Sequence, residues 1–370
     1  VWTQLAFQPT YDPSDIARAV YMVATKAATI VPFTPFDTQE AFIARMGVRN
    51  VVLKPRQEGS TTLWLMLLHA IAWTTPNVNI LVITHLKEAT AGLRETCQNW
   101  TRWLNEHFSA GIAIGADNAN EMEFSDMNSR IFFGTSGTPG VGRSKTIHAA
   151  LLSEVAWWEG NEYGGIVESM PDNGLVVSES TPNGSGGTYY DLYKNKNSYV
   201  KHFAPWFIEH SRRIKLPEGT KLTLTDDEHA LVLRHGLDYE QIAWRRWKQA
   251  DMKSNGSKIP FEQEYPEDDI SCFTAGAKAA FRPRIMVPLI ERARITPPVQ
   301  RDDVPGETWD PGGELLVWQP PISGHHYIVT GDVGVGHEDG DQSYAVVLDI
   351  KTKKHVASLR GWWTSVTFGR

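Results

Sequence analysis

The sequence predicts an α/β fold built around a parallel sheet, followed by further domains toward its carboxyl end. Short apolar runs alternate with helical stretches between residues 50 and 194. A tryptophan-rich, charged and more helical segment follows from about residue 205. A Pro/Asp/Gly-rich stretch at 295–313 then precedes three more apolar runs. The length of 370 residues exceeds one ordinary domain, so we expect two or three.

Composition narrows the functional class. With 41% hydrophobic and 21% charged residues the chain is globular, and its net charge of −7 gives no overall signal of a basic nucleic-acid binder, although a local basic groove is compatible with it. Cys97 and Cys272 lie far apart in the sequence, which favours a reducing compartment. No apolar run reaches the ~18 residues of a membrane span, and we find no signal peptide. Because the sequence starts at Val1 and ends within a strand-like pattern, we expect a fragment.

The first apolar runs predict a buried sheet. Strands are expected at 50–53, 79–84, 130–133, 147–152 and 175–178, and helices at 61–73, 87–107 and 188–194. Continuous apolar strands separated by helices are typical of a parallel sheet covered on both faces, with ligands at the carboxyl ends of the strands. We expect a core at 1–204, a helical subdomain at 205–285, a linker at 286–318, and a second α/β domain from 319 to 370. The last would open with an antiparallel meander of strands at 326–331, 343–350 and 354–362.

The segment VVLKPRQEGSTT, residues 51–62, has the outline of a phosphate-binding loop between a strand and a helix. Gly59 fits the second glycine of that pattern, and Thr61 fits the hydroxyl that binds Mg²⁺. Ser60 occupies the usual lysine position, whereas Lys54 and Arg56 supply cations earlier in the loop. An ordinary strand–turn–helix with a Ser/Thr cap remains the alternative.

Three later positions fit the chemistry of ATP hydrolysis. Glu154 follows an apolar run, where a carboxylate can activate water, and Ser153 stands where an aspartate usually supports Mg²⁺. Arg143 lies on a glycine-rich loop suited to an arginine finger, and Thr181 ends another apolar run. Each has a plainer interpretation as a solvated strand end, a solvated loop arginine or a Pro-Asn-Gly turn.

In combination these segments resemble the large subunit of a tailed-bacteriophage or herpesvirus-type terminase, a DNA-packaging motor, over most of the chain. The segment FDTQEAF resembles its adenine-contacting motif, KPRQEGSTT its deviant phosphate loop, and RSKTIHAALLSEVAWW its arginine and catalytic-glutamate segment. VVSESTPNGSGGTYYDLY resembles its coupling motif, and IPFEQEYPED a segment that closes its ATPase region.

The resemblance implies a parallel-sheet P-loop ATPase of the additional-strand, catalytic-glutamate type with a helical lid, followed by the start of a ribonuclease-H-like nuclease domain. It implies ATP, Mg²⁺, and Mg²⁺ or Mn²⁺ at the nuclease site. The implied ATP-binding residues are Gln39, Lys54, Arg56, Gln57, Gly59, Ser60, Thr61 and Thr62. The implied catalytic residues are Glu154, Arg143 and Thr181, and the metal-binding residues are Thr61, Ser153 through water, Asp332 and Asp341 (Asp339 being a weaker candidate).

The resemblance also implies double-stranded DNA, a portal protein and a small terminase subunit as partners, with a homo-oligomeric ring, of five subunits in the family, on the portal. The location would be the host cytoplasm, transiently docked on a viral procapsid, with no membrane. Because the expected nuclease carboxylates beyond Arg370 are not in the sequence, we expect little cleavage by this fragment.

Ser60 and Ser153 depart from the family pattern and keep two other functions open. One is a helicase-like ATPase, which predicts a second complete ATPase-like domain. The other is a non-hydrolysing DNA-binding assembly module, in which both serines mark loss of the site. The Asp332 hairpin has its own alternative, a turn that the Asp and Gly residues serve.

Overall fold

The computed structural model describes residues 1–25, 27–138, 145–274, 289–290, 292–293, 295–305, 312–334 and 341–369. The chain divides into two compact units, residues 1–284 and 285–370. Within the described ranges, no helix combines the length and the apolar character that crossing a bilayer requires.

The first unit is organised around an eight-stranded sheet in the order β10-β3-β9-β8-β4-β7-β6-β5. Its strands are β3 (Arg49–Leu53), β4 (Asn79–Thr84), β5 (Ile114–Asn118), β6 (Glu121–Phe124), β7 (Ser129–Thr135), β8 (Ala149–Ser153), β9 (Leu175–Ser180) and β10 (Val200–Phe203). Strands β10 to β7 pair in parallel, and β6 and β5 continue the sheet antiparallel. The predicted α/β class with a parallel sheet is therefore confirmed.

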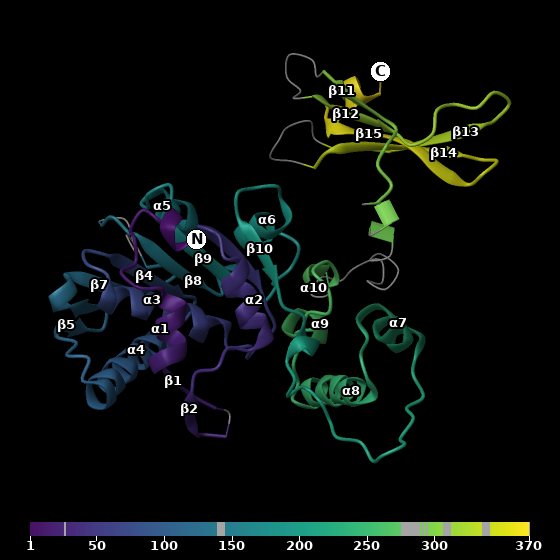
Figure 1. The fold of residues 1–370 in the computed structure, drawn as a ribbon. Helices are drawn as coiled ribbons and strands as arrows, with labels where there is room; N and C mark the ends of the chain where they lie inside the picture. Colours follow the sequence, from purple (N-terminus) through teal and green to yellow (C-terminus); the bar gives the residue numbers. More distant parts are fainter. Residues whose placement is uncertain are drawn as a thin grey trace. The chain divides into compact units, whose positions relative to one another are not determined.

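Helices cover both faces of this sheet (Figure 1). The core on one face includes residues of α1 (Pro13–Val20), α2 (Asp37–Arg45), α3 (Ser60–Thr74) and α4 (Lys87–Phe108). The core on the other face includes residues of α5 (Glu162–Glu168), α6 (Thr188–Lys194) and α10 (Ser271–Thr274). Helix α3 is apolar on nearly every side and buried along most of its length. Its packing in the core therefore fixes the position of its N-terminus, which directly follows the loop after β3.

A helical segment follows β10 and has a core of its own around Trp206, Ile242 and Phe261. Its elements are η4 (Trp206–Ile208), α7 (Asp226–His235), α8 (Tyr239–Ser254) and α9 (Phe261–Glu264). Capping boxes at Thr225 and Asp238 start α7 and α8. Each cap side chain accepts a hydrogen bond from the N–H of the third helical residue, and the side chain of that residue, a Glu or a Gln, accepts from the N–H of the cap. The shorter elements elsewhere in the unit are η1 (Trp2–Gln4), β1 (Met22–Ala24), β2 (Ile30–Pro32), η2 (Ser125–Met127) and η3 (Val155–Trp157).

The second unit contains an antiparallel sheet in the order β11-β12-β15-β14-β13. Its elements are β11 (Gln300–Val304), β12 (Gly312–Val317), β13 (Tyr327–Asp332), β14 (Ser343–Asp349), β15 (Lys354–Trp362) and α12 (Ser365–Phe368). The three-stranded meander is present where the apolar runs predict it. The range 286–318, expected to be a linker, also contributes β11 and β12. The edge strand β11 reads QRDDV and is almost wholly exposed, so its polar sequence lacks the apolar signal of a strand.

Candidate functional site

The segment predicted to bind phosphate, residues 54–60 and called the phosphate loop below, joins the buried strand β3 to the N-terminus of α3. Gly59 is the N-cap of that helix and adopts φ +68°, and Gln57 has φ +59°. No side chain caps the helix, so its first N–H groups and the positive end of its dipole are available to an anion at the carboxyl edge of the sheet.

Gln39 braces this loop from α2. Its Nε2 donates to the Gly59 carbonyl over 3.0 Å, and its Oε1 accepts from the Phe36 N–H over 3.0 Å. The left-handed φ favours glycine at position 59, and a Cβ there would lie 2.9 Å from the same Nε2, so another residue would displace the Gln39 amide. The structure therefore places Gln39 beside the phosphate loop with both ends of its amide bonded to the backbone, and its predicted contact with adenine stays a prediction.

Lys54 lies buried directly after β3, with only 5% of its surface exposed. Its Nζ is 2.9 Å from Glu154 Oε1. Burial acts to lower the pKa of Lys54, but the Glu179 and Glu154 carboxylates outweigh it and raise the pKa above its ordinary value. Lys54 is thus a buried, charged ammonium group at the start of the phosphate loop.

Glu154 directly follows β8 and has an unusual backbone, with φ +55°. Its Oε2 accepts from Ser180 Oγ over 3.2 Å, from the Thr181 N–H over 3.2 Å and from Thr181 Oγ1 over 3.3 Å. Burial acts to raise its pKa, but Lys54 and these donors lower it below the ordinary value. Glu154 is therefore an ionised hydrogen-bond acceptor, as a residue that activates water must be.

The sequence does not predict Glu179 as a site residue, yet three hydroxyl groups of predicted site residues donate to its carboxylate. It is fully buried on β9. Its Oε2 accepts from Ser60 Oγ over 2.5 Å, and its Oε1 accepts from Ser153 Oγ over 3.1 Å and from the Thr61 hydroxyl. The signal that points to it is a charged residue inside the apolar run LVVSES, because buried carboxylates are rare unless they are paired or functional.

Arg56 and Gln57 occupy the outer part of the phosphate loop. The Arg56 side chain is 63% exposed and forms an ion pair with Glu264 of α9, whose carbonyl accepts from the Arg56 N–H over 3.1 Å. Arg212 donates to the Arg56 carbonyl over 2.6 Å and pairs with Glu58 over 2.9 Å. The helical segment therefore contacts the phosphate loop through ion pairs and hydrogen bonds. Gln57 is exposed, and Thr62 is half-buried in the first turn of α3.

Of the remaining predicted site residues, two fall outside the described residues and two belong to the second unit. Arg143 falls in the range 139–144 and Asp339 in the range 335–340, and neither range is among the described residues. Asp332 ends β13 and Asp341 lies just before β14, both exposed, in the second unit. Among the described residues, no three His, Cys, Asp or Glu side chains form a group able to hold a metal ion.

The donor set beside the phosphate loop nevertheless suits Mg²⁺ bound together with a nucleotide. Mg²⁺ retains waters and is commonly held by one or two carboxylates plus substrate phosphates, so it needs no all-protein cage. Thr61 supplies a hydroxyl at the helix N-terminus, and Glu179 supplies a buried carboxylate next to it. Together with Lys54 and Glu154, the arrangement can hold an anion and accept a proton from water.

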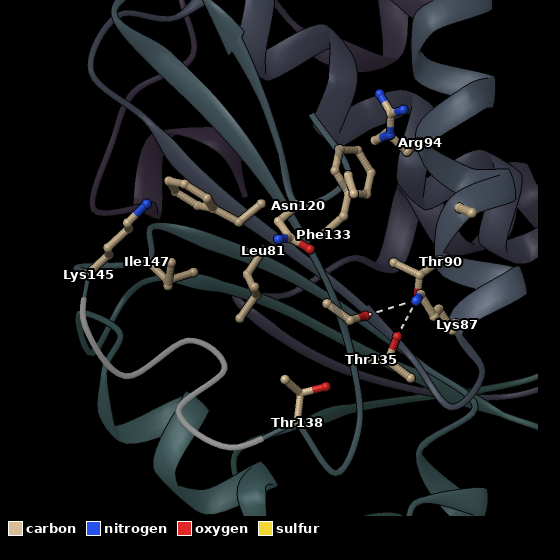
Figure 2. A pocket seen from close by; sticks show the side chains of 14 residues that line it. Leu81, Lys87, Thr90, Arg94, Asn120, Phe133, Thr135, Thr138, Lys145 and Ile147 are labelled. Atoms are coloured by element: carbon tan, nitrogen blue, oxygen red, sulfur yellow. Dashed lines mark hydrogen bonds between the residues drawn. The ribbon is translucent and has the colours of Figure 1, made fainter. Parts of the chain in front are cut away.

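A separate cavity of about 650 Å³ lies between α4, β4 and β7. Figure 2 shows Lys145 on the side opposite Lys87 and Arg94, with Thr90 hydrogen-bonded to Thr135 over 3.1 Å. Arg94 pairs with Asp117 over 2.6 Å, and the Lys145 ammonium lies over the Phe132 ring. None of the lining residues belongs to the phosphate loop, so this cavity is distinct from the site above.

Comparison with known proteins identifies the fold. No protein-family model matches the sequence, and no curated protein matches it. The structure is similar to the large terminase of bacteriophage HK97, with a TM-score of 0.50 and 11% identity, over 91% of this chain and 64% of that one. It is also similar to the large terminase ATPase domain of Thermus phage P74-26 (TM-score 0.44, 13% identity, 64% of this chain and 95% of that one).

A third similar structure is the large terminase of a thermophilic bacteriophage in complex with ADP (TM-score 0.39, 10% identity, 85% of this chain and 65% of that one). The structural neighbours are thus phage large terminases. At 11% identity, the likeness to the HK97 protein establishes a shared fold, a mixed α/β architecture with a large, mostly parallel sheet. The chain spans less than two thirds of that protein's length.

Proposed function

We propose that the chain is the ATPase part of a terminase large subunit and drives double-stranded DNA into a viral procapsid. The observation that carries this is the meeting of Lys54, Glu154 and Thr181 beneath an uncapped helix N-terminus. Strand β9 lies between β3, which leads into the phosphate loop, and β8, which leads into Glu154. This order supports a P-loop ATPase of the additional-strand, catalytic-glutamate type, and the HK97 likeness supports the fold.

Each residue has a defined task in this proposal. The N–H groups of the phosphate loop and of the first turn of α3, with Lys54, bind the phosphates, and Gln39 positions the loop and adenine. Mg²⁺, held by Thr61 and the phosphates, would neutralise the charge that develops on them. Glu154 accepts the proton of the attacking water. Thr181 connects Glu154 to the segment that follows β9 and so couples hydrolysis to movement.

The helical segment acts as a lid, since Glu264 and Arg212 hold the phosphate loop through Arg56 and Glu58. Arg143 acts as an arginine finger toward the ATP of a neighbouring subunit in a ring of five. The portal protein and the small terminase subunit are the partners on the procapsid, in the host cytoplasm. Asp332 and Asp341 begin a ribonuclease-H-like site for Mg²⁺ or Mn²⁺ that cuts concatemeric DNA in the complete protein.

The helicase-like alternative requires a second ATPase-like domain after the first. In its described residues, the second unit instead contains an antiparallel sheet. The non-hydrolysing alternative makes the opposite prediction for nucleotide binding. It expects no thermal shift with ATP and Mg²⁺, whereas the proposed function expects the protein to be stabilised by both together.

The decisive experiment replaces Glu154 by Gln and measures DNA-stimulated ATP hydrolysis. We expect turnover to fall by roughly 10²–10⁴-fold, the usual contribution of a general base, while nucleotide still binds. Glu159→Gln is the matched control, because Glu159 is an exposed carboxylate in the same segment and is expected to leave turnover unchanged. Unchanged hydrolysis by the Glu154 variant would remove the assignment.

A further inference from the structure

The two serines that depart from the usual nucleotide-site pattern contact the same carboxylate. Ser60 stands where the loop lysine is expected, and Ser153 stands where an aspartate is expected on β8. Both hydroxyls donate to Glu179 on the neighbouring strand, over 2.5 Å and 3.1 Å. Two departures that looked independent in the sequence therefore form one structural unit.

The register of the sheet explains how a carboxylate on β9 can serve in place of one on β8. Ser153 and Glu179 are direct partners in the parallel pair β8–β9, so their side chains leave the same face of the sheet side by side. Glu179 is one methylene longer than an aspartate, and its Oε1 lies 3.1 Å from the Ser153 hydroxyl. The carboxylate thus lies next to the space that an aspartate at position 153 would enter.

Glu179 is a buried carboxylate that accepts hydrogen bonds from hydroxyl groups and lies near the charge of Lys54. Its side chain is fully buried, and three hydroxyl groups donate to it. In the described part of the chain its carboxylate forms no direct ion pair, but the Lys54 ammonium is near enough for Glu179 to raise the pKa of Lys54. A buried carboxylate is costly unless its charge is compensated, and here the hydroxyl donors and the charge of Lys54 together supply that compensation.

We propose that Glu179 supplies from β9 the carboxylate that β8 lacks at Ser153, and that it positions the Thr61 hydroxyl for the magnesium ion of Mg·ATP. Because the Thr61 hydroxyl donates its hydrogen bond to Glu179, the lone pairs of its oxygen would be available to bind a metal ion. Glu179 is thus a positioning residue acting through Thr61. This inference rests on the proposed nucleotide site and assigns to that site a carboxylate outside the sequence-based set.

The test measures the affinity for a fluorescent ATP analogue in Mg²⁺ and in EDTA, without reference to turnover. In the wild-type chain, Mg²⁺ should strengthen binding. Glu179→Gln keeps the size of the side chain and one acceptor oxygen but removes its charge, and it turns the other oxygen into a donor NH2 group. We expect it to lose roughly 10–100-fold in the Mg²⁺-dependent part of the affinity, the range found when a group that orients a metal ligand is removed, with the affinity in EDTA retained.

A charge-exchange variant provides the rescue. Ser153→Asp combined with Glu179→Ser keeps one carboxylate in the cluster and moves it to β8. We expect this double variant to recover most of the Mg²⁺-dependent affinity. Ser153→Asp alone would place two carboxylates side by side and is expected to bind nucleotide more weakly than the double variant. Thermal unfolding of each protein reports whether it is folded, and if Glu179→Gln unfolds, the double variant decides.

The outcomes separate this inference from the proposed function. A wild-type chain that binds no nucleotide with or without Mg²⁺ removes the proposed function, and this inference with it. If the wild type shows Mg²⁺-dependent binding and Glu179→Gln retains all of it, the nucleotide site stands and the role of Glu179 is wrong. A folded double variant that recovers none of the metal dependence would also overturn the exchange between the two strands.

Discussion

Lys54 and Glu154 are 100 residues apart in the sequence, yet their side chains form an ion pair of 2.9 Å at the carboxyl edge of the main sheet. The pair joins the cation assigned to phosphate with the carboxylate assigned to water. Glu179 and Glu154 together raise the pKa of Lys54, and Lys54 lowers the pKa of Glu154, in both cases in spite of burial. We expect the phosphates of ATP to compete for Lys54 and thereby release Glu154.

The pair gives a prediction about which cation of the loop holds phosphate. Lys54→Ala should weaken ATP binding by roughly tenfold or more, because a hydrogen bond to a charged group contributes about 1.5–3 kcal/mol. Arg56→Ala should weaken the binding free energy of ATP by about 1 kcal/mol or less, since the Arg56 side chain is 63% exposed and already paired with Glu264. Equilibrium titration of each variant with nucleotide measures both. A larger loss in the Arg56 variant would reverse the assignment, and normal binding by both would show that the loop is not a phosphate site.

The conformation of Gly59 gives a stability prediction with an internal control. Gly59→Ala should destabilise the chain by about 1–2 kcal/mol, the cost of a left-handed alanine, with a further loss as Gln39 is displaced. Gly92→Ala lies in the exposed part of α4 with open space around its Cβ, and it should stabilise by about 0.5–1 kcal/mol. Thermal unfolding of the two variants is the measurement. Equal shifts in the same direction would contradict the conformational argument.

The sequence predicts most of the central sheet, because its inner strands are buried at nearly every position and therefore appear in the sequence as continuous apolar runs. Runs such as NILVIT become β4, and the helical stretch after the phosphate loop becomes α3. The same criterion fails for exposed strands. The strand β5 reads IGADN and is largely exposed at the sheet edge, so neither apolar character nor alternation marks it. The edge strand β11 of the second unit is missed for the same reason.

The site is predictable where a residue follows an apolar run, and unpredictable where cross-strand register decides. Lys54, Glu154 and Thr181 each come just after a buried strand, and the carboxyl ends of parallel strands meet at one edge. The same criterion does not mark Glu179, because this residue lies inside its strand. Its importance comes from standing opposite Ser153, a relationship that only the pairing of β8 with β9 creates. The ion pair of Arg56 with Glu264 likewise depends on how the helical segment returns to the loop.

Thr181 allows the support of Glu154 to be tested apart from nucleotide binding. Its hydroxyl donates to Glu154 Oε2 over 3.3 Å and accepts from Trp157 Nε1 over 3.0 Å. Thr181→Val keeps the shape but removes both bonds, so we expect a lower kcat with nucleotide affinity unchanged. Thr181→Ser retains the hydroxyl and should behave like the wild-type chain. Steady-state ATPase assays decide, and a rise in KM alone would assign Thr181 to substrate binding instead.

The ion pair between Glu228 and Arg246 predicts a pH-dependent stability of the helical segment. Arg246 Nε donates to Glu228 Oε1, and its Nη2 donates to Oε2, both over 2.6 Å. This hydrogen bonding by Arg246 lowers the pKa of Glu228 from 4.5 to about 2. A carboxylate with a depressed pKa in the folded state stabilises fully above its unfolded pKa, and this contribution disappears as the pH falls from about 4.5 toward 2.

Glu228→Gln should therefore destabilise the chain at pH 7 by about 1.5–3 kcal/mol, the range for hydrogen bonds to charged groups. The difference between the variant and the wild-type chain should shrink as the pH falls through the window set by the two pKa values, because the wild-type glutamate becomes neutral as well. Urea unfolding followed by tryptophan fluorescence at several pH values measures it. Glu218→Gln, at an exposed loop position, is the control and should show no such dependence. A difference that persists undiminished at low pH would mean that Glu228 acts through its shape and not through its charge.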